Sequence, residues 1–206
     1  MAEQGHDFDG HYWEEHWRQA HRGGAGVDPS PHLVRETSGL TPGTALDAGC
    51  GEGGEASWLA GRGWDVTAVD ISAEALARAA AHEFSTAVTW VRADLTEWAP
   101  ETRFDLVMTH YAHPAMPQLA FYDRIAGWVA PGGTLLIVGH LHTAGHGHHP
   151  PEASVTLADI TAGLDTADWE IVTAAAHVRT RTAPDGRSVP LHDVVVRATR
   201  NDALGA

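Results

Sequence analysis

The amino-acid sequence predicts a doubly wound α/β fold, in which helices cover both faces of a mostly parallel sheet. Short apolar runs alternate with helical patterns between residues 44 and 139, as is typical of parallel strands joined by helical crossovers. Two further apolar runs, Trp169–Ala176 and Val189–Ala198, flank Asp185-Gly186, a dipeptide that favours a tight hairpin turn. An antiparallel hairpin is therefore expected to complete the sheet.

The alternating region contains five expected strands. They are Thr44–Asp47, Asp65–Val69, Val88–Arg92, Phe104–Thr109 and Thr134–Gly139. The helices between them are expected at Glu55–Gly61, from the N-cap residue Ser72 to about His82, and at Gln118–Val129 before Pro131-Gly132-Gly133.

Three short helices are expected outside this region. Tyr12–Ala20 and His32–Ser38 have helical patterns in the N-terminal part of the chain. Thr156 and Asp159 have the spacing of a capping box, which predicts a helix that ends near Leu164.

The composition disfavours several classes of partner. The 206 residues include 27 acidic and 13 basic side chains, all 13 of them arginine, and the formal net charge is −14. Nucleic acids and anionic membranes bind clustered Lys and Arg, so neither is an expected partner. No apolar run reaches the roughly 18 to 20 residues of a membrane span. Without a visible export signal, and with Cys50 as the only cysteine, we expect a cytoplasmic protein.

A glycine-rich turn, GCGEGG at 49–54, follows the first strand and opens the first helix. Glycine lets a ligand approach the backbone, and the helix start offers unpaired N–H groups. Gly49, Gly51 and Gly54 fit the dinucleotide pattern G-x-G-x-x-G, with Asp70 about twenty residues on. The same turn fits G-x-G-x-G of S-adenosylmethionine sites, so by itself it leaves both ligands open.

The carboxylates around the turn distinguish the two ligands. Asp47 precedes the turn, Asp70 ends the second strand and Asp94 follows the third. They suit an ammonium, the ribose hydroxyls and an adenine amino group, in that order, whereas they would repel a pyrophosphate. Ile71 is expected to pack on the adenine and the Leu95 amide to donate to its ring. This pattern favours S-adenosylmethionine over a dinucleotide.

The segments ALDAGCGEGGEASWLA, WDVTAVDIS, WVRADL, RFDLVMTH and APGGTLLIV resemble those of class I S-adenosylmethionine-dependent methyltransferases over residues 44–139. The resemblance implies a Rossmann-like, seven-stranded sheet whose last strand is antiparallel. It also implies a cofactor site that includes Gly49, Cys50 and Gly51. The N-terminal YWEEHW resembles small tellurite-resistance and thiopurine-type methyltransferases, which implies that Trp13 and Trp17 belong to a lid over the cofactor.

Histidines are concentrated after the fourth and fifth strands, in THYAHP at 109–114 and GHLHTAGHGHHPP at 139–151. In the family these strand ends open onto the methyl group, so His110, His113, His140 and His142 are expected to converge there. We predict catalytic roles for His110, His113 and His142, with His110 also in contact with the cofactor, because imidazole serves as a general base. We predict no metal site, although H-x-x-H and H-x-H spacings fit metal ligation.

We therefore expect an enzyme that transfers the methyl group of S-adenosylmethionine in line to a small-molecule nucleophile. A base is required only where that nucleophile carries a proton. Residues 1–206 are expected to form one domain, as a monomer or homodimer, with a helical lid (1–40), a cofactor-binding core (41–139) and a His-rich loop with the substrate-side region (140–206). A nicotinamide-dependent oxidoreductase and a non-enzymatic metal-binding protein that uses the His-rich loop remain as alternatives.

Overall fold

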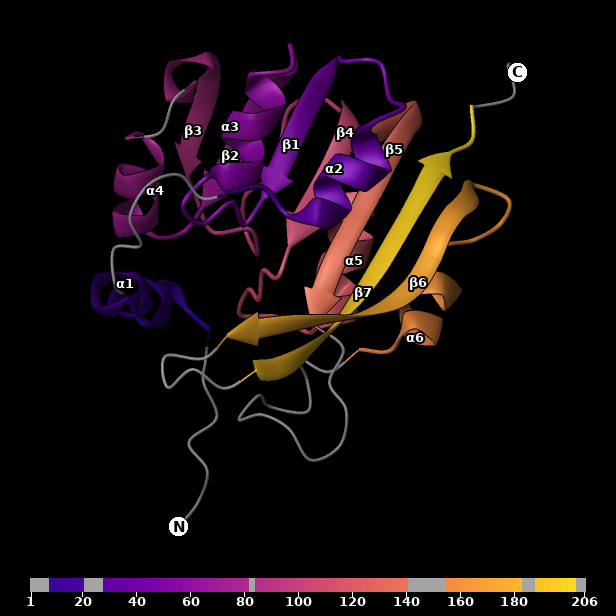
Figure 1. The fold of residues 1–206 in the computed structure, drawn as a ribbon. Coiled ribbons are helices and arrows are strands. Elements are labelled where there is room, and N and C mark those ends of the chain that lie inside the picture. Colours follow the sequence, from indigo (N-terminus) through magenta and orange to yellow (C-terminus); the bar gives the residue numbers. More distant parts are fainter. Residues whose placement is uncertain (1–7, 21–27, 82–83, 141–154, 183–187, 203–206) are drawn as a thin grey trace.

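The computed structural model describes residues 8–20, 28–81, 84–140, 155–182 and 188–202. Within these ranges the chain forms a seven-stranded sheet with the order β3-β2-β1-β4-β5-β7-β6. Strands β1 to β5 are parallel, whereas β7 runs antiparallel to both β5 and β6 (Figure 1). The predicted fold class, including the antiparallel C-terminal hairpin, is confirmed.

The parallel strands lie within one or two residues of their expected positions, except that β5 begins earlier. They are β1 Thr44–Ala48, β2 Asp65–Asp70, β3 Val88–Arg92, β4 Phe104–His110 and β5 Val129–His140. Nearly every residue of β1 and β4 is buried, as expected for central strands covered on both faces.

Helices cover both faces of the sheet. Their bounds are α2 Pro31–Thr37, α3 Gly54–Ala60, α4 Ala73–Ala79, α5 Gln118–Ala126 and α6 Leu157–Ala162, with a short 3₁₀ turn η1 at Ser85–Ala87. Side chains of α2, α3 and α4 pack into one apolar cluster, and those of α5 and α6 into another on the opposite face.

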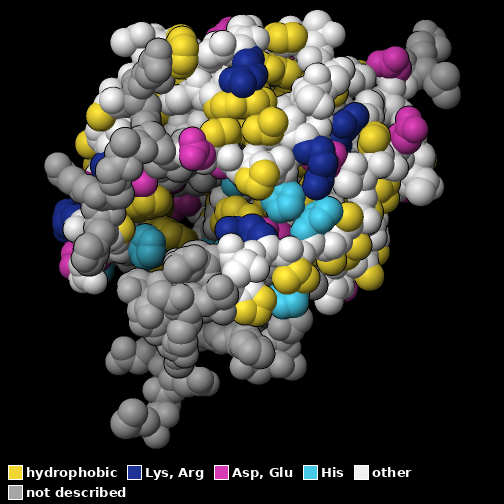
Figure 2. All heavy atoms as spheres, in the orientation of Figure 1, with side chains coloured by type: hydrophobic (Ala, Val, Ile, Leu, Met, Phe, Trp, Pro, Cys, Tyr) yellow, Lys and Arg dark blue, Asp and Glu magenta, His cyan; other side chains and the backbone are white. Residues whose placement is uncertain are grey.

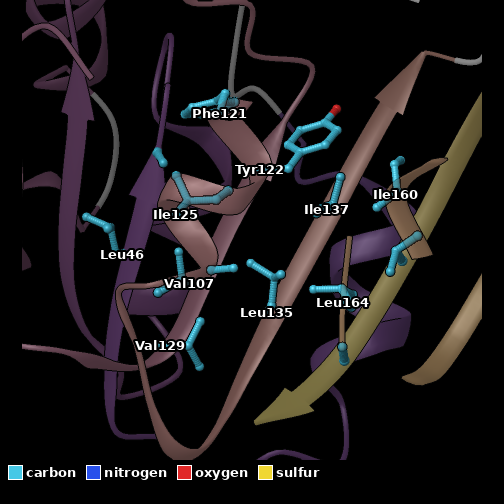
Figure 3. Close-up of a cluster of buried hydrophobic side chains, with 14 of the residues drawn as sticks. Leu46, Val107, Phe121, Tyr122, Ile125, Val129, Leu135, Ile137, Ile160 and Leu164 are labelled. Carbon is cyan, nitrogen blue, oxygen red and sulfur yellow. The ribbon is translucent and has the colours of Figure 1, made fainter. Parts of the chain in front are cut away.

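Figure 3 shows the second of these clusters. Ile125 of α5 lies next to Val107 of the sheet, and Phe121 of α5 and Ile160 of α6 belong to the same cluster. Because the central strands are fixed from both sides, their carboxyl ends form a rigid edge.

Two local motifs begin their helices as the sequence predicts. The Ser72 hydroxyl accepts a hydrogen bond from the Ala75 amide at 3.2 Å at the start of α4. Thr156 and Asp159 form the reciprocal capping box of α6, with distances of 3.2 and 3.0 Å between side chain and backbone. Both satisfy N–H groups that a helix start leaves unpaired.

Helix α5 is shorter than predicted. It ends at Ala126 instead of Val129, because Val129 already pairs with Phe104 as the first residue of β5. Helix α4 likewise ends at Ala79, before the expected boundary near His82. The hairpin strands are longer than predicted, with β6 at Trp169–Thr182 and β7 at Ser188–Arg200. Asp185-Gly186 lies outside the described residues.

Helix α1, Gly10–Gln19, lies apart from the two helical layers. Figure 1 places it at the edge toward which the arrowheads of β1 and β5 point. The Asp9 side chain caps it by accepting from the Tyr12 amide at 2.8 Å. No helix among the described residues is long and apolar enough to cross a membrane.

Candidate functional site

A cavity of about 400 Å³ lies at the carboxyl edge of the parallel strands. Its walls come from the glycine turn, the ends of β1, β2, β4 and β5, the segment after β3, and α1. Its size falls within the range of small-molecule sites. Figure 2, in the orientation of Figure 1, shows acidic, histidine and hydrophobic side chains around a hollow between α1 and the ends of the strands.

Every predicted cofactor contact lines this cavity. The residues are Trp13, Trp17, Asp47, Gly49, Cys50, Gly51, Asp70, Ile71, Asp94, Leu95 and His110. His113, a predicted catalytic residue, lines it as well. His142 lies outside the described residues, as do His146, His148 and His149.

The glycine turn is held against the end of β2. The amides of Gly49 and Cys50 both donate to the Val69 carbonyl, at 2.9 and 3.0 Å. Gly49 and Gly51 adopt φ values of +82° and +51°, which favour glycine. A Cβ at Gly49 would lie 2.4 Å from the Ala112 Cβ, so a side chain here would collide with the opposite wall.

Asp70 links the turn to the start of α4. One oxygen accepts from the Gly51 amide at 2.8 Å and the other from the Ser72 amide at 2.9 Å. Burial raises the pKa of Asp70, and these two amide donors partly counteract the rise. Each carboxylate oxygen can accept a further hydrogen bond, as the predicted contact with ribose hydroxyls requires.

Asp47 is the most deeply buried acid of the cavity, at 1% exposed. Its Oδ2 has no hydrogen-bond partner among the described residues. Burial, followed by the nearby charges of Glu55 and Asp70, raises its pKa well above the usual range. A buried, unsatisfied acceptor beside two other acids is costly unless a cation pairs with it, which suits the predicted ammonium.

Asp94 has one oxygen engaged within its own turn. Oδ1 accepts from the Thr96 amide at 2.8 Å and from the Thr96 hydroxyl at 2.7 Å. Oδ2 remains for the predicted adenine amino group. Leu95 beside it is fixed because its carbonyl accepts from Arg124 Nε at 2.9 Å.

Helix α1 contacts both sides of the cavity. Trp13 Nε1 donates to the His113 carbonyl at 3.0 Å. Glu14 accepts from the Ser72 hydroxyl at 2.8 Å, which ties α1 to the start of α4. The Trp17 ring lies against Gly51, where a Cβ would be 3.0 Å from the ring. This geometry supports the predicted lid.

Arg78 of α4 was not predicted from the sequence as a functional residue. It holds α1 in place from outside the cavity. Its side chain contacts Glu52 at 2.9 Å and Glu74 at 3.1 Å. It also donates to the carbonyls of Trp17 and Ala20 at the end of α1. No local motif distinguishes Arg78 from an ordinary exposed helix residue.

The predicted histidines occupy different environments. Both ring nitrogens of His110 are buried without hydrogen-bond partners among the described residues, and burial lowers its pKa. His113 is buried, and its Nδ1 lies 3.0 Å from Gln118 Oε1. Gln118 in turn donates to the Ala112 carbonyl at 3.0 Å, so His113 belongs to a fixed loop.

A polar cluster beside the cavity contains residues that the sequence-based site missed. Asp193 of β7 is fully buried and contacts Arg179, His32 and His140. His140 stacks on Tyr111 with 4.3 Å between ring centroids, and both rings line the cavity. The sequence does contain a feature that could have predicted this cluster. Asp193 interrupts the apolar run of β7, and a buried charge requires partners.

Two further observations concern metal and thiol chemistry. Among the residues that the structure describes, no group of three or more His, Cys, Asp or Glu side chains is arranged to hold a metal ion.

Cys50 is 6% exposed, and burial, followed by the charges of Asp47 and Asp70, raises its pKa. The thiol therefore stays protonated, in agreement with a packing role.

Comparison with known proteins identifies the core of the chain. A family model described as a methyltransferase domain matches residues 45–133. An uncharacterised methyltransferase of Mycobacterium tuberculosis is 41% identical over 95 residues, covering 45% of this chain and 48% of the relative. A trans-aconitate 2-methyltransferase of Azoarcus sp. is 35% identical over 98 residues, covering 46% of this chain and 38% of the relative. The matched part thus spans about half or less of these curated relatives.

The fold is similar to that of a TehB-like S-adenosylmethionine-dependent methyltransferase from Corynebacterium glutamicum. The TM-score is 0.59 at 19% identity, over 93% of this chain and 98% of that one. The predicted resemblance and the TehB-like similarity are thereby confirmed. S-adenosylmethionine, the predicted cofactor, is named for the Corynebacterium structure, and the role of each site residue stays a prediction. Residues 45–133 are thus similar to the methyltransferase-domain family, and the chain has the fold of an S-adenosylmethionine-dependent methyltransferase.

Proposed function

We propose that this chain transfers the methyl group of S-adenosylmethionine to a small, uncharged or soft nucleophile. One observation carries the proposal: Asp47, Asp70 and Asp94, from three neighbouring strand ends, line a single cavity around the glycine turn. Asp47 would hold the ammonium, Asp70 the ribose and Asp94 the adenine amino group. Gly49, Cys50 and Gly51 form the wall against the methionyl part, and Ile71 and Leu95 lie beside the adenine.

The chain's own residues would align the reaction and exclude water from it. Methyl transfer is an in-line displacement, so the nucleophile must lie opposite the sulfur at near-attack distance. His110 and His113 extend the cavity beyond the glycine turn, where they are available to the acceptor. Trp13 and Trp17 of α1 cover it, and this cover keeps water out. Residues 1–40 thus act as the lid in this proposal, 41–139 as the cofactor core and 140–206 as the substrate side.

The charge of the cavity bears on the acceptor. The acids Asp47, Glu52, Glu55, Asp70 and Asp94 line it, and no Arg or Lys does so among the described residues. Residues 141–154 contain neither Arg nor Lys. Trans-aconitate, named for the Azoarcus relative, is a tricarboxylate and would meet repulsion here. We therefore favour an acceptor without multiple negative charges.

Isothermal titration calorimetry with S-adenosylmethionine and S-adenosylhomocysteine tests the proposal. Asp70→Asn should weaken both affinities by roughly 10- to 100-fold, because the amide cannot replace a charged acceptor. Asp65→Asn, at the far end of the same strand, is the matched control and should change neither affinity. Absence of binding to the wild type, or equal affinity in the Asp70 variant, would refute the site.

The two alternatives are tested on the same protein. Gly49, Gly51 and Gly54 also fit a dinucleotide site, so fluorescence titration with reduced nicotinamide dinucleotide should show no binding if the proposal holds. Elemental analysis should find no stoichiometric metal. Stoichiometric metal that is lost on deletion of residues 142–149 would instead indicate a metal-binding protein.

A further inference from the structure

Asp193 is placed where a strand normally carries an apolar residue. It is fully buried in β7, where it pairs with His140 of β5 across the sheet, while the next residue, Val194, pairs with Gly139. Oδ2 accepts from Arg179 Nε at 2.6 Å and lies 3.2 Å from His32 Nε2. Burial raises the pKa of Asp193, but His140, Arg179 and His32 together hold it well below its usual range. Asp193 is therefore an ionised carboxylate inside the fold.

His140 is the link between this carboxylate and the cavity. It is the last residue of β5, its ring lines the cavity, and its side chain is 31% exposed. Nδ1 lies 3.6 Å from Asp193 Oδ1, which has no hydrogen-bond partner among the described residues. Stacking on Tyr111 fixes the plane of the ring. With Nδ1 at Asp193, Nε2 is the nitrogen available to a ligand.

We propose that His140, oriented by Asp193, is the general base of methyl transfer and that the acceptor presents a hydroxyl or N–H group on a planar ring. The inference deepens the proposed function and rests on it. A carboxylate on one imidazole nitrogen orients the ring and stabilises the imidazolium that forms when the other nitrogen takes a proton. The rings of Trp13, Tyr111 and His113 line the same cavity and suit a planar acceptor.

The step balances without another reactant. The acceptor oxygen or nitrogen forms a bond to the methyl carbon while the carbon–sulfur bond breaks. The electron pair of the broken carbon–sulfur bond goes to sulfur, which changes from a sulfonium to a neutral thioether. The acceptor proton moves to Nε2 of His140, and the resulting imidazolium pairs with Asp193.

The charged surroundings favour His140 over His110 as the base. Around His140 lie Asp193 of β7, Arg179 of β6, His32 of α2 and Tyr111 after β4. Asp193 is the acid of this group and directly faces the ring. His110 has no such partner, since both its nitrogens are buried and unpaired among the described residues. Its burial opposes a positive charge.

Nitrogen-15 NMR of histidine-labelled protein saturated with S-adenosylhomocysteine tests the arrangement without any acceptor. The His140 resonances are assigned by their loss in His140→Gln. Neutral His140 should carry its proton on Nδ1, and Asp193→Asn should change the tautomer population. A wild-type proton on Nε2, or an unchanged population in Asp193→Asn, overturns the proposal.

Turnover provides the second test. Release of S-adenosylhomocysteine is measured with phenol, 2-naphthol, indole and thiophenol as probes. The wild type should methylate at least one O–H or N–H probe, and His140→Gln should lower that kcat by roughly 100-fold or more. Affinity for S-adenosylhomocysteine should change less than about twofold, because the base does not hold the cofactor. His11→Gln is the matched control, since His11 is exposed and does not line the cavity, and should retain kcat.

The proposed cofactor site and the proposed base are tested separately by these measurements. If the wild type does not bind S-adenosylhomocysteine, the proposed function is wrong. If it binds but methylates only thiophenol or no probe, or if His140→Gln keeps its kcat, the base and the acceptor class are wrong while the cofactor site stands.

Discussion

At the scale of single residues, the ammonium-binding role proposed for Asp47 implies a cost to the stability of the unliganded protein. Its carboxyl is 1% exposed, has an unpartnered oxygen and feels the charges of Glu55 and Asp70. A carboxylate in this setting destabilises the free protein and gains its counter-charge only from the ligand.

Asp47→Asn should therefore stabilise the free protein and weaken the complex. The raised pKa means that the folded state keeps a proton that the unfolded chain loses near pH 4, so wild-type stability falls as pH rises from about 4 through the raised value. The variant should lose less stability between pH 5 and 8, with about 10- to 100-fold weaker binding of S-adenosylhomocysteine. Thermal unfolding with and without ligand measures both. A lower Tm of the free variant with normal binding would contradict this account.

Gly49→Ala and Gly63→Ala separate backbone strain from steric overlap. Both glycines have positive φ, +82° and +87°, so each alanine should cost about 1 kcal/mol of unfolding free energy. A Cβ at Gly63 meets nothing within 4 Å, whereas one at Gly49 lies 2.4 Å from the Ala112 Cβ and should cost a further 1–3 kcal/mol or so. Denaturant titration gives the two values, and equal losses would show that Ala112 moves away freely.

At the scale of elements, α1 depends on α4 for its position. The Arg78 side chain contacts Glu52 and Glu74 and donates to two carbonyls at the end of α1. Among the described residues, Arg18 of α1 forms ion pairs with Glu14 and Glu15 of its own helix, and its side chain is 56% exposed. Such pairs contribute little.

Arg78→Met should free the lid, whereas Arg18→Met should not. We expect faster amide hydrogen exchange across Gly10–Gln19 and affinity for S-adenosylhomocysteine lower by on the order of fivefold in the Arg78 variant. Mass spectrometry and calorimetry give the two readouts. Equal exchange in both variants would show that the other contacts of α1, such as the hydrogen bond between Glu14 and Ser72, hold it without Arg78.

The sequence predicted elements better than it predicted their ends. The apolar spacing of Gln118–Val129 continues past the true end of α5 at Ala126. Only pairing with Phe104, a contact between distant segments, makes Val129 a strand residue. The three carboxylates that line the cavity were predictable because each lies at or just after the end of its own strand. Asp193 was not, because its partner His32 is 161 residues away in the chain.

At the scale of the whole molecule, the net charge of −14 and the acids that line the cavity both favour the binding of a positively charged ligand. S-adenosylmethionine carries a sulfonium that S-adenosylhomocysteine lacks, so the protein's field attracts the substrate cofactor more than its product. The ratio of the two affinities should fall about two- to threefold when NaCl rises from roughly 0.02 to 0.5 M, because salt screens the exposed charges. Calorimetry at both salt concentrations tests this, and a constant ratio would assign the discrimination to buried contacts alone.

The position of β7 has a consequence for the order in which the molecule can assemble during synthesis. It is the last of the seven strands along the chain, yet it lies between β5 and β6, and Val194, Val195 and Val196 are fully buried there. A ribosome-bound chain that has reached β6 holds all the parallel strands but leaves β5 as an open edge, and such edges are prone to wrong pairing. The parallel strands β1 to β5 can therefore pair early, whereas the edge that carries Asp193 closes only when β7 emerges.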